Sequence, residues 1–145
     1  AGLGDSFTIL DVITVNTTIL TEDDDGQVDG TVPNGSMQIE VRGYVDDSGA
    51  VIAEEIRERG DADPSDVRLR GPVGSISNPT FEILGVTVDT VTATSILDDR
   101  VSPPQPIDAT TFFSRISEGT PVQVEDGTFS NATDTISGGV IEIED

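Results

Sequence analysis

The chain has 145 residues, with seven basic side chains, all arginine, against 28 acidic ones, which gives a formal net charge of −21. It contains no histidine, cysteine, lysine or tryptophan. These counts exclude a Ser-His or Cys-His catalytic pair, a zinc finger, haem ligation through histidine and a disulfide framework. The charge also excludes nucleic acid as a favourable partner, because a phosphate backbone would be repelled. No run of about 18 apolar residues occurs, so the sequence predicts no membrane-spanning segment.

Three sequence blocks occur twice along the chain, in the same order. Each block is short and rich in valine, isoleucine, threonine and phenylalanine, which is typical of strands. Three matched blocks in one order indicate a tandem duplication. The pairs are SFTILDVITVNT (residues 6–17) with TFEILGVTVDT (80–90), QIEVRGYV (38–45) with PVQVEDGTF (121–129), and VIAEEIRE (51–58) with GVIEIED (139–145).

Turn and cap signals separate the blocks. DDSG at residues 46–49 lies between two apolar runs and predicts a hairpin. An extra residue near Ile13, and Asp126 inserted before Gly127, predict two β-bulges. Residues 109–116 are the one helical candidate, with Asp108 as its N-cap.

The blocks of the second repeat resemble a known family. They are LRGPVGSI (residues 69–76), FEILGVTVDT (81–90), FFSRISEGTPVQVEDGTF (112–129) and VIEIED (140–145). Together they are similar to the bacterial "domain of unknown function 5666" family of small, roughly OB-like β-barrels. The resemblance covers nearly all of residues 67–145 and, less completely, residues 5–60. It implies a fold and an envelope or secreted context, but no activity.

We therefore expect an all-β protein of two tandem small antiparallel β-barrel, OB-like modules, with at most one short helix. The expected organisation is a first module at residues 1–60, a linker at 61–66 and a second module at 67–145. The second module begins with a strand at residues 66–76, whereas the first has only residues 1–5 in that place. The first barrel is then open or frayed at that edge, or the strand at 66–76 serves both modules, or another chain fills the gap.

The last alternative predicts a function. A missing edge strand and the absence of catalytic residue types indicate a non-enzymatic protein, a self-assembling fibre or surface-layer subunit joined by strand complementation. Its partners would be identical subunits, and its place would be extracellular or on the cell surface, where salt screens the acidic charge. We expect the C-terminal strand to be donated and arginines to compensate its charge. The residues of this assembly edge are Val140, Ile141, Ile143, Arg42, Arg57, Arg68 and Arg70.

A calcium- or small-ligand-binding module of a larger secreted or envelope protein is the alternative function. TEDDDGQVDG at residues 21–30 resembles a calcium loop, but Val32 stands where an EF-hand needs a bidentate glutamate. Hard oxygen ligands still cluster in the sequence, and no other cofactor is expected. The candidate calcium ligands are Asp23, Asp25, Asp29, Asp61, Asp63 and Asp66.

Three asparagines fit the acceptor pattern for N-glycosylation. They are Asn16, Asn34 and Asn131, whereas Asn78 is disqualified by the proline that follows it.

Overall fold

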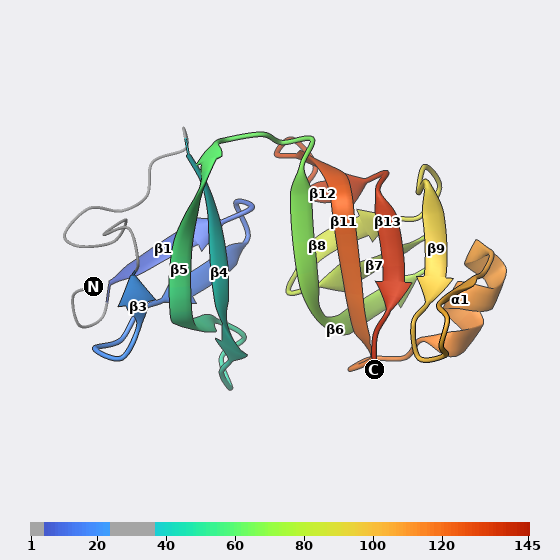
Figure 1. Cartoon of the computed structure of the whole chain (residues 1–145), viewed down its shortest axis with the longest axis horizontal. Helices are drawn as coiled ribbons and strands as arrows, with labels where there is room; N and C mark the ends of the chain where they lie inside the picture. The colour runs from blue at the N-terminus through green and yellow to red at the C-terminus, as the bar shows by residue number, and fades with distance from the viewer. Residues whose placement is uncertain (1–4, 24–36) are drawn as a thin grey trace. The chain divides into compact units, whose positions relative to one another are not determined.

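The computed structural model describes residues 5–23 and 37–145. These residues form thirteen strands and one helix. The chain divides into two compact units, Ala1–Asp63 (unit 1) and Pro64–Asp145 (unit 2). The division falls inside the stretch 61–66 that the sequence predicts as a linker. Figure 1 shows the strands of each unit, which are described separately below.

Unit 1 is a five-stranded sheet built around its last strand. That strand, β5, is antiparallel to β4 but parallel to β2 and to β3. The remaining strand, β1, forms an antiparallel hairpin with β2. The strands are β1 (Ser6–Ile9), β2 (Ile13–Asn16), β3 (Glu22–Asp23), β4 (Met37–Val45) and β5 (Val51–Asp61).

The two hairpins of unit 1 have different turn chemistry. Asp46 Oδ1 accepts hydrogen bonds from the N–H groups of Ser48 and Ala50, at 2.8 and 3.1 Å, which confirms the hairpin predicted at residues 46–49. The extra residue near Ile13 does not form a bulge. The β1–β2 register is unbroken, and the extra residue lies in the connecting loop, where Asp11 adopts φ 55°. Aspartate tolerates this left-handed conformation better than most residues.

Unit 2 closes its sheet into a barrel. Its strand order is β10-β9-β13-β11-β12-β8-β7-β6, and β6 also pairs with β11. A register shift between Val124 and Gly127, with Asp126 at φ 53°, confirms the bulge predicted in β11. The strands are β6 (Val67–Ser77), β7 (Thr80–Ile83), β8 (Val86–Asp89), β9 (Ser95–Asp98), β10 (Gln105–Pro106), β11 (Pro121–Ser130), β12 (Thr135–Ser137) and β13 (Val140–Ile143).

The single helix, α1 (Ala109–Arg115), belongs to unit 2. Its N-cap Asp108 accepts a hydrogen bond from the Thr111 N–H at 2.7 Å, as the sequence predicts. Phe112 of α1 is fully buried, and its ring centroid lies 5.2 Å from that of Phe81. The helix therefore covers the core with an aromatic contact.

The two units repeat one arrangement of strands. The β1–β2 hairpin corresponds to β7–β8, with Phe7 and Phe81 buried at matching positions, 6% and 1% exposed. The strand β4 corresponds to β11, and β5 takes the places of both β12 and β13. The parallel pairs β2–β5 and β3–β5 match β8–β12 and β9–β13. The chain is thus all-β, with tandem barrel modules and one short helix.

The close approach of β4 to β5 at Gly43 gives a test of unit 1. A Cβ atom on Gly43 would collide with the backbone carbonyl oxygen of Ile52. Because this atom belongs to the backbone, it cannot move aside as a flexible side chain could. We expect Gly43→Ala to lower the free energy of unfolding of unit 1 by about 1–3 kcal/mol. Gly74→Ala is the matched control, since its Cβ would lie 3.8 Å from Glu82. Hydrogen exchange of the backbone amides, followed separately for each unit, measures both effects. Amides of unit 1 that are as well protected in Gly43→Ala as in Gly74→Ala would contradict the packing described.

Candidate functional site

Two strand edges of unit 1 are open where unit 2 is closed. Within residues 5–23 and 37–145, β1 pairs only with β2, and β4 only with β5. Their counterparts in unit 2, β7 and β11, both pair with β6 as well. The described part of unit 1 therefore lacks a counterpart of β6, at the position where the sequence predicts a missing strand.

Aliphatic side chains beside these edges are incompletely covered. Val41 of β4 is half-buried, whereas its counterpart Val124 is fully buried beside Leu69 of β6. Ile9 of β1 is likewise half-buried, and its counterpart Ile83 is fully buried. In the described residues, the difference falls on the two strands whose counterparts β6 flanks in unit 2. A strand added to unit 1 would bury apolar surface as well as pair backbone groups.

The backbone of β1 presents hydrogen-bonding groups to the open edge. The Thr17 N–H donates to the Asp5 carbonyl at 2.9 Å, and the Val12 N–H donates to the Ile9 carbonyl at 3.3 Å. Alternate residues of an antiparallel strand bond to opposite sides. Since Asp5 and Ile9 bond toward β2, Thr8 directs its N–H and C=O groups away from β2. Thr8 is exposed and lies at the position that β6 would flank.

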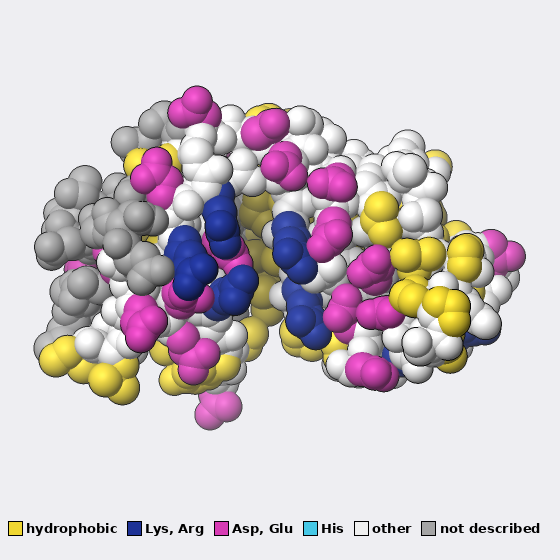
Figure 2. Space-filling view, in the orientation of Figure 1, with side chains coloured by type: hydrophobic (Ala, Val, Ile, Leu, Met, Phe, Trp, Pro, Cys, Tyr) yellow, Lys and Arg dark blue, Asp and Glu magenta, His cyan; other side chains and the backbone are white. Residues whose placement is uncertain are grey.

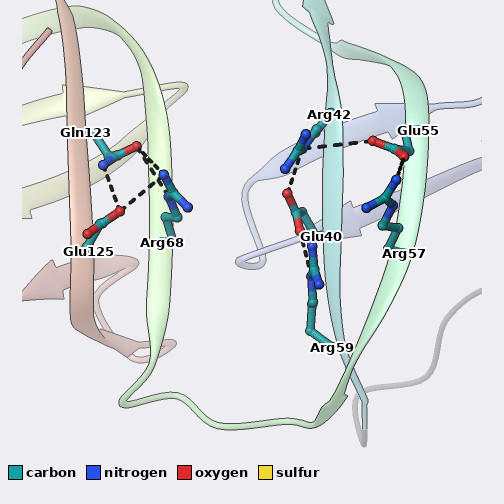
Figure 3. A network of polar contacts seen from close by, with 8 residues as sticks. All are labelled: Glu40, Arg42, Glu55, Arg57, Arg59, Arg68, Gln123 and Glu125. Atoms are coloured by element: carbon teal, nitrogen blue, oxygen red, sulfur yellow. Dashed lines mark hydrogen bonds and ion pairs between the residues drawn. The ribbon is translucent and has the colours of Figure 1, made fainter.

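A ladder of alternating charges covers the outer face of β4 and β5. Glu40 accepts hydrogen bonds from Arg59 Nε at 2.6 Å and Arg42 Nε at 2.7 Å. Arg42 Nε also lies 3.9 Å from Glu55, which pairs with Arg57 (Figure 3). The pairing with Arg59 and Arg42 lowers the pKa of Glu40. Three arginines against two glutamates make this ladder locally positive on a chain of net charge −21.

The corresponding outer face of the unit 2 sheet is acidic apart from two arginines of β6. Arg68 lies 2.8 Å from Gln123 and 3.1 Å from Glu125 (Figure 3). Arg70 lies 3.1 Å from Glu144. In Figure 2 the arginine side chains gather over β4 and β5 in unit 1, and over β6 in unit 2. Arg68 and Arg70, predicted for an assembly edge, thus neutralise carboxylates of their own unit.

The predicted donor strand has a different position from the one expected. Val140, Ile141 and Ile143 lie in β13, which pairs with β11 on one side and with β9 on the other. Ile141 and Ile143 are fully buried. This placement corrects the expectation that the C-terminal strand forms an assembly edge, because both its edges are used within unit 2. Likewise, β6 pairs only with strands of unit 2, so it does not serve both modules.

Four of the six candidate calcium ligands lie in the described residues. Asp23 is half-buried in β3, Asp61 ends β5, and Asp63 and Asp66 are exposed in the connection that follows. No group of three or more potential ligands is assembled among residues 5–23 and 37–145. The remaining two, Asp25 and Asp29, fall outside the described residues, and calcium binding stays a prediction.

The three candidate glycosylation sites differ in position. Asn16 is half-buried at the end of β2, and Asn131 is exposed in the turn after β11. Asn34 falls outside the described residues.

One buried charged cluster was not anticipated from the sequence. The carboxylate of Asp98, in β9, is only 4% exposed and accepts from Arg100 Nε and Nη2 at 2.8 and 2.7 Å. Arg115 of α1 donates to the same carboxylate at 2.8 Å. Arg100, and then Arg115, lower the pKa of Asp98 well below its usual range against the opposing effect of burial. The cluster joins α1 to β9 and is structural.

These features define the chain as a pair of tandem small β-barrel modules, one of them with open strand edges. It belongs to the family "Domain of unknown function (DUF5666)", whose model matches residues 2–57 and 70–129. Neither the comparison with curated proteins nor that with solved structures found a match. Among the described residues, none of the helical structure is long and apolar enough to cross a membrane.

The Asp98 cluster predicts a pH dependence. Because the pKa of Asp98 is lowered by folding, its ion pairs stabilise unit 2 above the unfolded-state pKa of about 4 and are lost as pH falls toward the folded-state pKa. Asp98→Asn should lower the free energy of unfolding by about 1.5–3 kcal/mol at pH 7. It should also flatten the loss of stability between about pH 5 and pH 2. Urea unfolding across pH measures this; an unchanged acid profile would contradict it.

Folding shifts the pKa of Glu142 in the opposite direction from that of Asp98. Burial, and then the neighbouring Glu125 and Glu144 carboxylates, raise its pKa. The charged form is therefore unfavourable in the folded state at neutral pH. Glu142→Gln should raise the free energy of unfolding by about 0.5 kcal/mol at pH 7. The gain should vanish well below the unfolded-state pKa of about 4.3, where the glutamate is protonated in both the folded and the unfolded state. Thermal melts at both pH values test it, and a destabilised variant at pH 7 would overturn it.

Proposed function

We propose that this protein is a non-enzymatic extracellular structural protein whose copies assemble by β-strand complementation. A strand from one subunit would complete unit 1 of the next. The observation that carries the proposal is the pair of open edges on β1 and β4, at the place where β6 closes unit 2.

The energetics of an open edge support this proposal. Backbone N–H and C=O groups at an exposed edge, such as those of Thr8, must bond to water or to another strand. An added strand would pair such groups on both flanking strands and cover Ile9 and Val41, which are half-buried. Natural proteins normally block an edge of this kind, because it is a template for strand addition.

The arrangement of the two units favours a linear assembly. The closing strand is present in unit 2 and lacking in the described part of unit 1, so the accepting surface belongs to unit 1 alone. A contact between unlike surfaces is heterologous, and it generates a ring or an open filament rather than a closed two-fold dimer. We therefore favour a filament or surface-layer subunit.

The composition supports the non-enzymatic and extracellular parts of the proposal. The chain has no histidine or cysteine to act as nucleophile or base, and 28 acidic residues must share one small surface. A surface of this charge repels itself less as ionic strength rises. The absence of cysteine fits a surface-exposed protein.

The assembly proposal is tested at the edge of β1. Thr8→Pro removes an N–H group that points away from β2, and proline on an edge strand blocks further pairing. Thr8→Val is the matched control, because it keeps the N–H group and favours a strand. The wild-type chain and Thr8→Val should form multimers that grow with concentration and appear as filaments in negative-stain micrographs. Thr8→Pro should reduce their mass at least tenfold.

Light scattering after size exclusion measures the mass, and circular dichroism checks that each variant keeps its strands. A wild-type chain that stays monomeric at high concentration and high salt would overturn the proposal. So would a folded Thr8→Pro variant that assembles as the wild type does.

A further inference from the structure

The geometry points to a particular chemistry for the accepted strand. We propose that unit 1 accepts an extended segment with aliphatic residues on its inner face and an acidic residue opposite Arg42. This inference rests on the proposed strand complementation and specifies what the accepting edge selects.

The inner face of the accepted strand is defined by β6. Val67, Leu69 and Val73 of β6 point into the core of unit 2 and are 8, 7 and 2% exposed. Leu69 is paired with Val124, the counterpart of Val41 in unit 1. An incoming strand thus needs an aliphatic residue beside Val41, which is half-buried and is paired with Ile56 of β5 on its other side.

A small residue is required two positions after this aliphatic one. In β6 that place is taken by Gly71, which is paired with Val122. A Cβ atom on Gly71 would lie 2.9 Å from Ile83 Cγ2. The counterparts of Val122 and Ile83 in unit 1 are Ile39 and Ile9, so a bulky side chain at this place of the accepted strand would meet two isoleucines. The inner pattern is therefore aliphatic, aliphatic, small and aliphatic at every second position, as in Val67, Leu69, Gly71 and Val73.

The outer face of the accepted strand differs from that of β6. Arg68 of β6 lies beside Gln123 and Glu125, a neutral and an acidic partner. The corresponding places on β4 are taken by Glu40 and Arg42.

Glu40 is already bonded to two arginines. Arg42 bonds to Glu40 and lies 3.9 Å from Glu55, but its side chain is still 62% exposed and can take a further acidic partner. An arginine at the place of Arg68 would therefore face a second arginine. An acidic residue there would gain an ion pair, which suits a second copy of this acidic chain as the donor.

Synthetic peptides test this specificity on the full chain. The first probe is the β6 peptide DVRLRGPVGSIS, residues 66–77, carrying a fluorophore. The second probe carries Arg68→Glu. The control peptide carries Val67→Asn and Leu69→Asn, which remove two of the three inner aliphatic residues. The chain is refolded from denaturant with the peptide present, so that no other subunit has occupied the edge, and fluorescence anisotropy reports binding.

The Arg68→Glu peptide should bind about three- to tenfold more tightly than the β6 peptide, as expected for one cross-strand ion pair exchanged for a repulsion. The control peptide should bind at least tenfold more weakly than either. Arg42→Glu in the protein should reverse the preference between the first two peptides. Thr8→Pro should weaken all binding, while Ser114→Glu, an added carboxylate at an exposed position of α1 in unit 2, should leave the preference unchanged.

The outcomes separate this inference from the assembly proposal. If the chain forms multimers but the preference survives Arg42→Glu, or the control peptide binds as well as the others, the strand chemistry is overturned and assembly stands. If the chain is monomeric but binds the Arg68→Glu peptide preferentially, the accepting edge stands and self-assembly is overturned. No saturable binding of any peptide overturns the inference.

Discussion

The closing strand β6 is the element on which the difference between the two units depends. It pairs with β7 on one side and with β11 on the other, and it thereby turns an open sheet into a barrel. With it, Ile83 and Val124 are completely buried; in the described part of unit 1, which has no such strand, Ile9 and Val41 are half-buried. One internal duplication thus contains both a closed module and its open form. A sheet edge must find partners for its backbone groups, and this requirement links the fold to assembly.

Charge is the second constraint on this molecule. The chain has seven arginines against 28 acidic residues, so most carboxylates have no arginine partner of their own. The positions of the arginines therefore decide which carboxylates are neutralised. In unit 2, Arg100 and Arg115 hold the buried Asp98, and Arg68 and Arg70 neutralise the outer face of the sheet. In unit 1, Arg42, Arg57 and Arg59 lie on β4 and β5 instead, where they contact Glu40 and Glu55. The outer face beside the open edge thus presents arginine side chains, a suitable neighbour for an acidic strand.

The turn residues show how closely sequence and backbone are linked in these small barrels. The two hairpins that correspond in the repeats carry Asp11 and Gly85 in the left-handed region, one by side-chain tolerance and one by lack of a Cβ. In β5 the chain runs on without a break, whereas β12 and β13 are separated by two glycines with positive φ, Gly138 and Gly139. The same arrangement of strands is thus built with one continuous strand in unit 1 and with two shorter strands in unit 2.

The sequence alone determined the duplication, the strands of the repeated blocks and the helix, because alternation, turn residues and an N-cap such as Asp108 are local signals. The strands β3, β9, β10 and β12 were not predicted from it. Comparison of the two repeats also led to the expectation that the first lacks a counterpart of β6, and the described part of unit 1 has none. Pairing between distant segments was decided only by the tertiary structure: β13 became a central strand rather than a free edge, and β5 became parallel to β2 and β3. The Asp98 cluster likewise needs α1 and β9 to meet. Local patterns fix which residues form strands, but strand order depends on contacts between segments far apart in the chain, which no local pattern records.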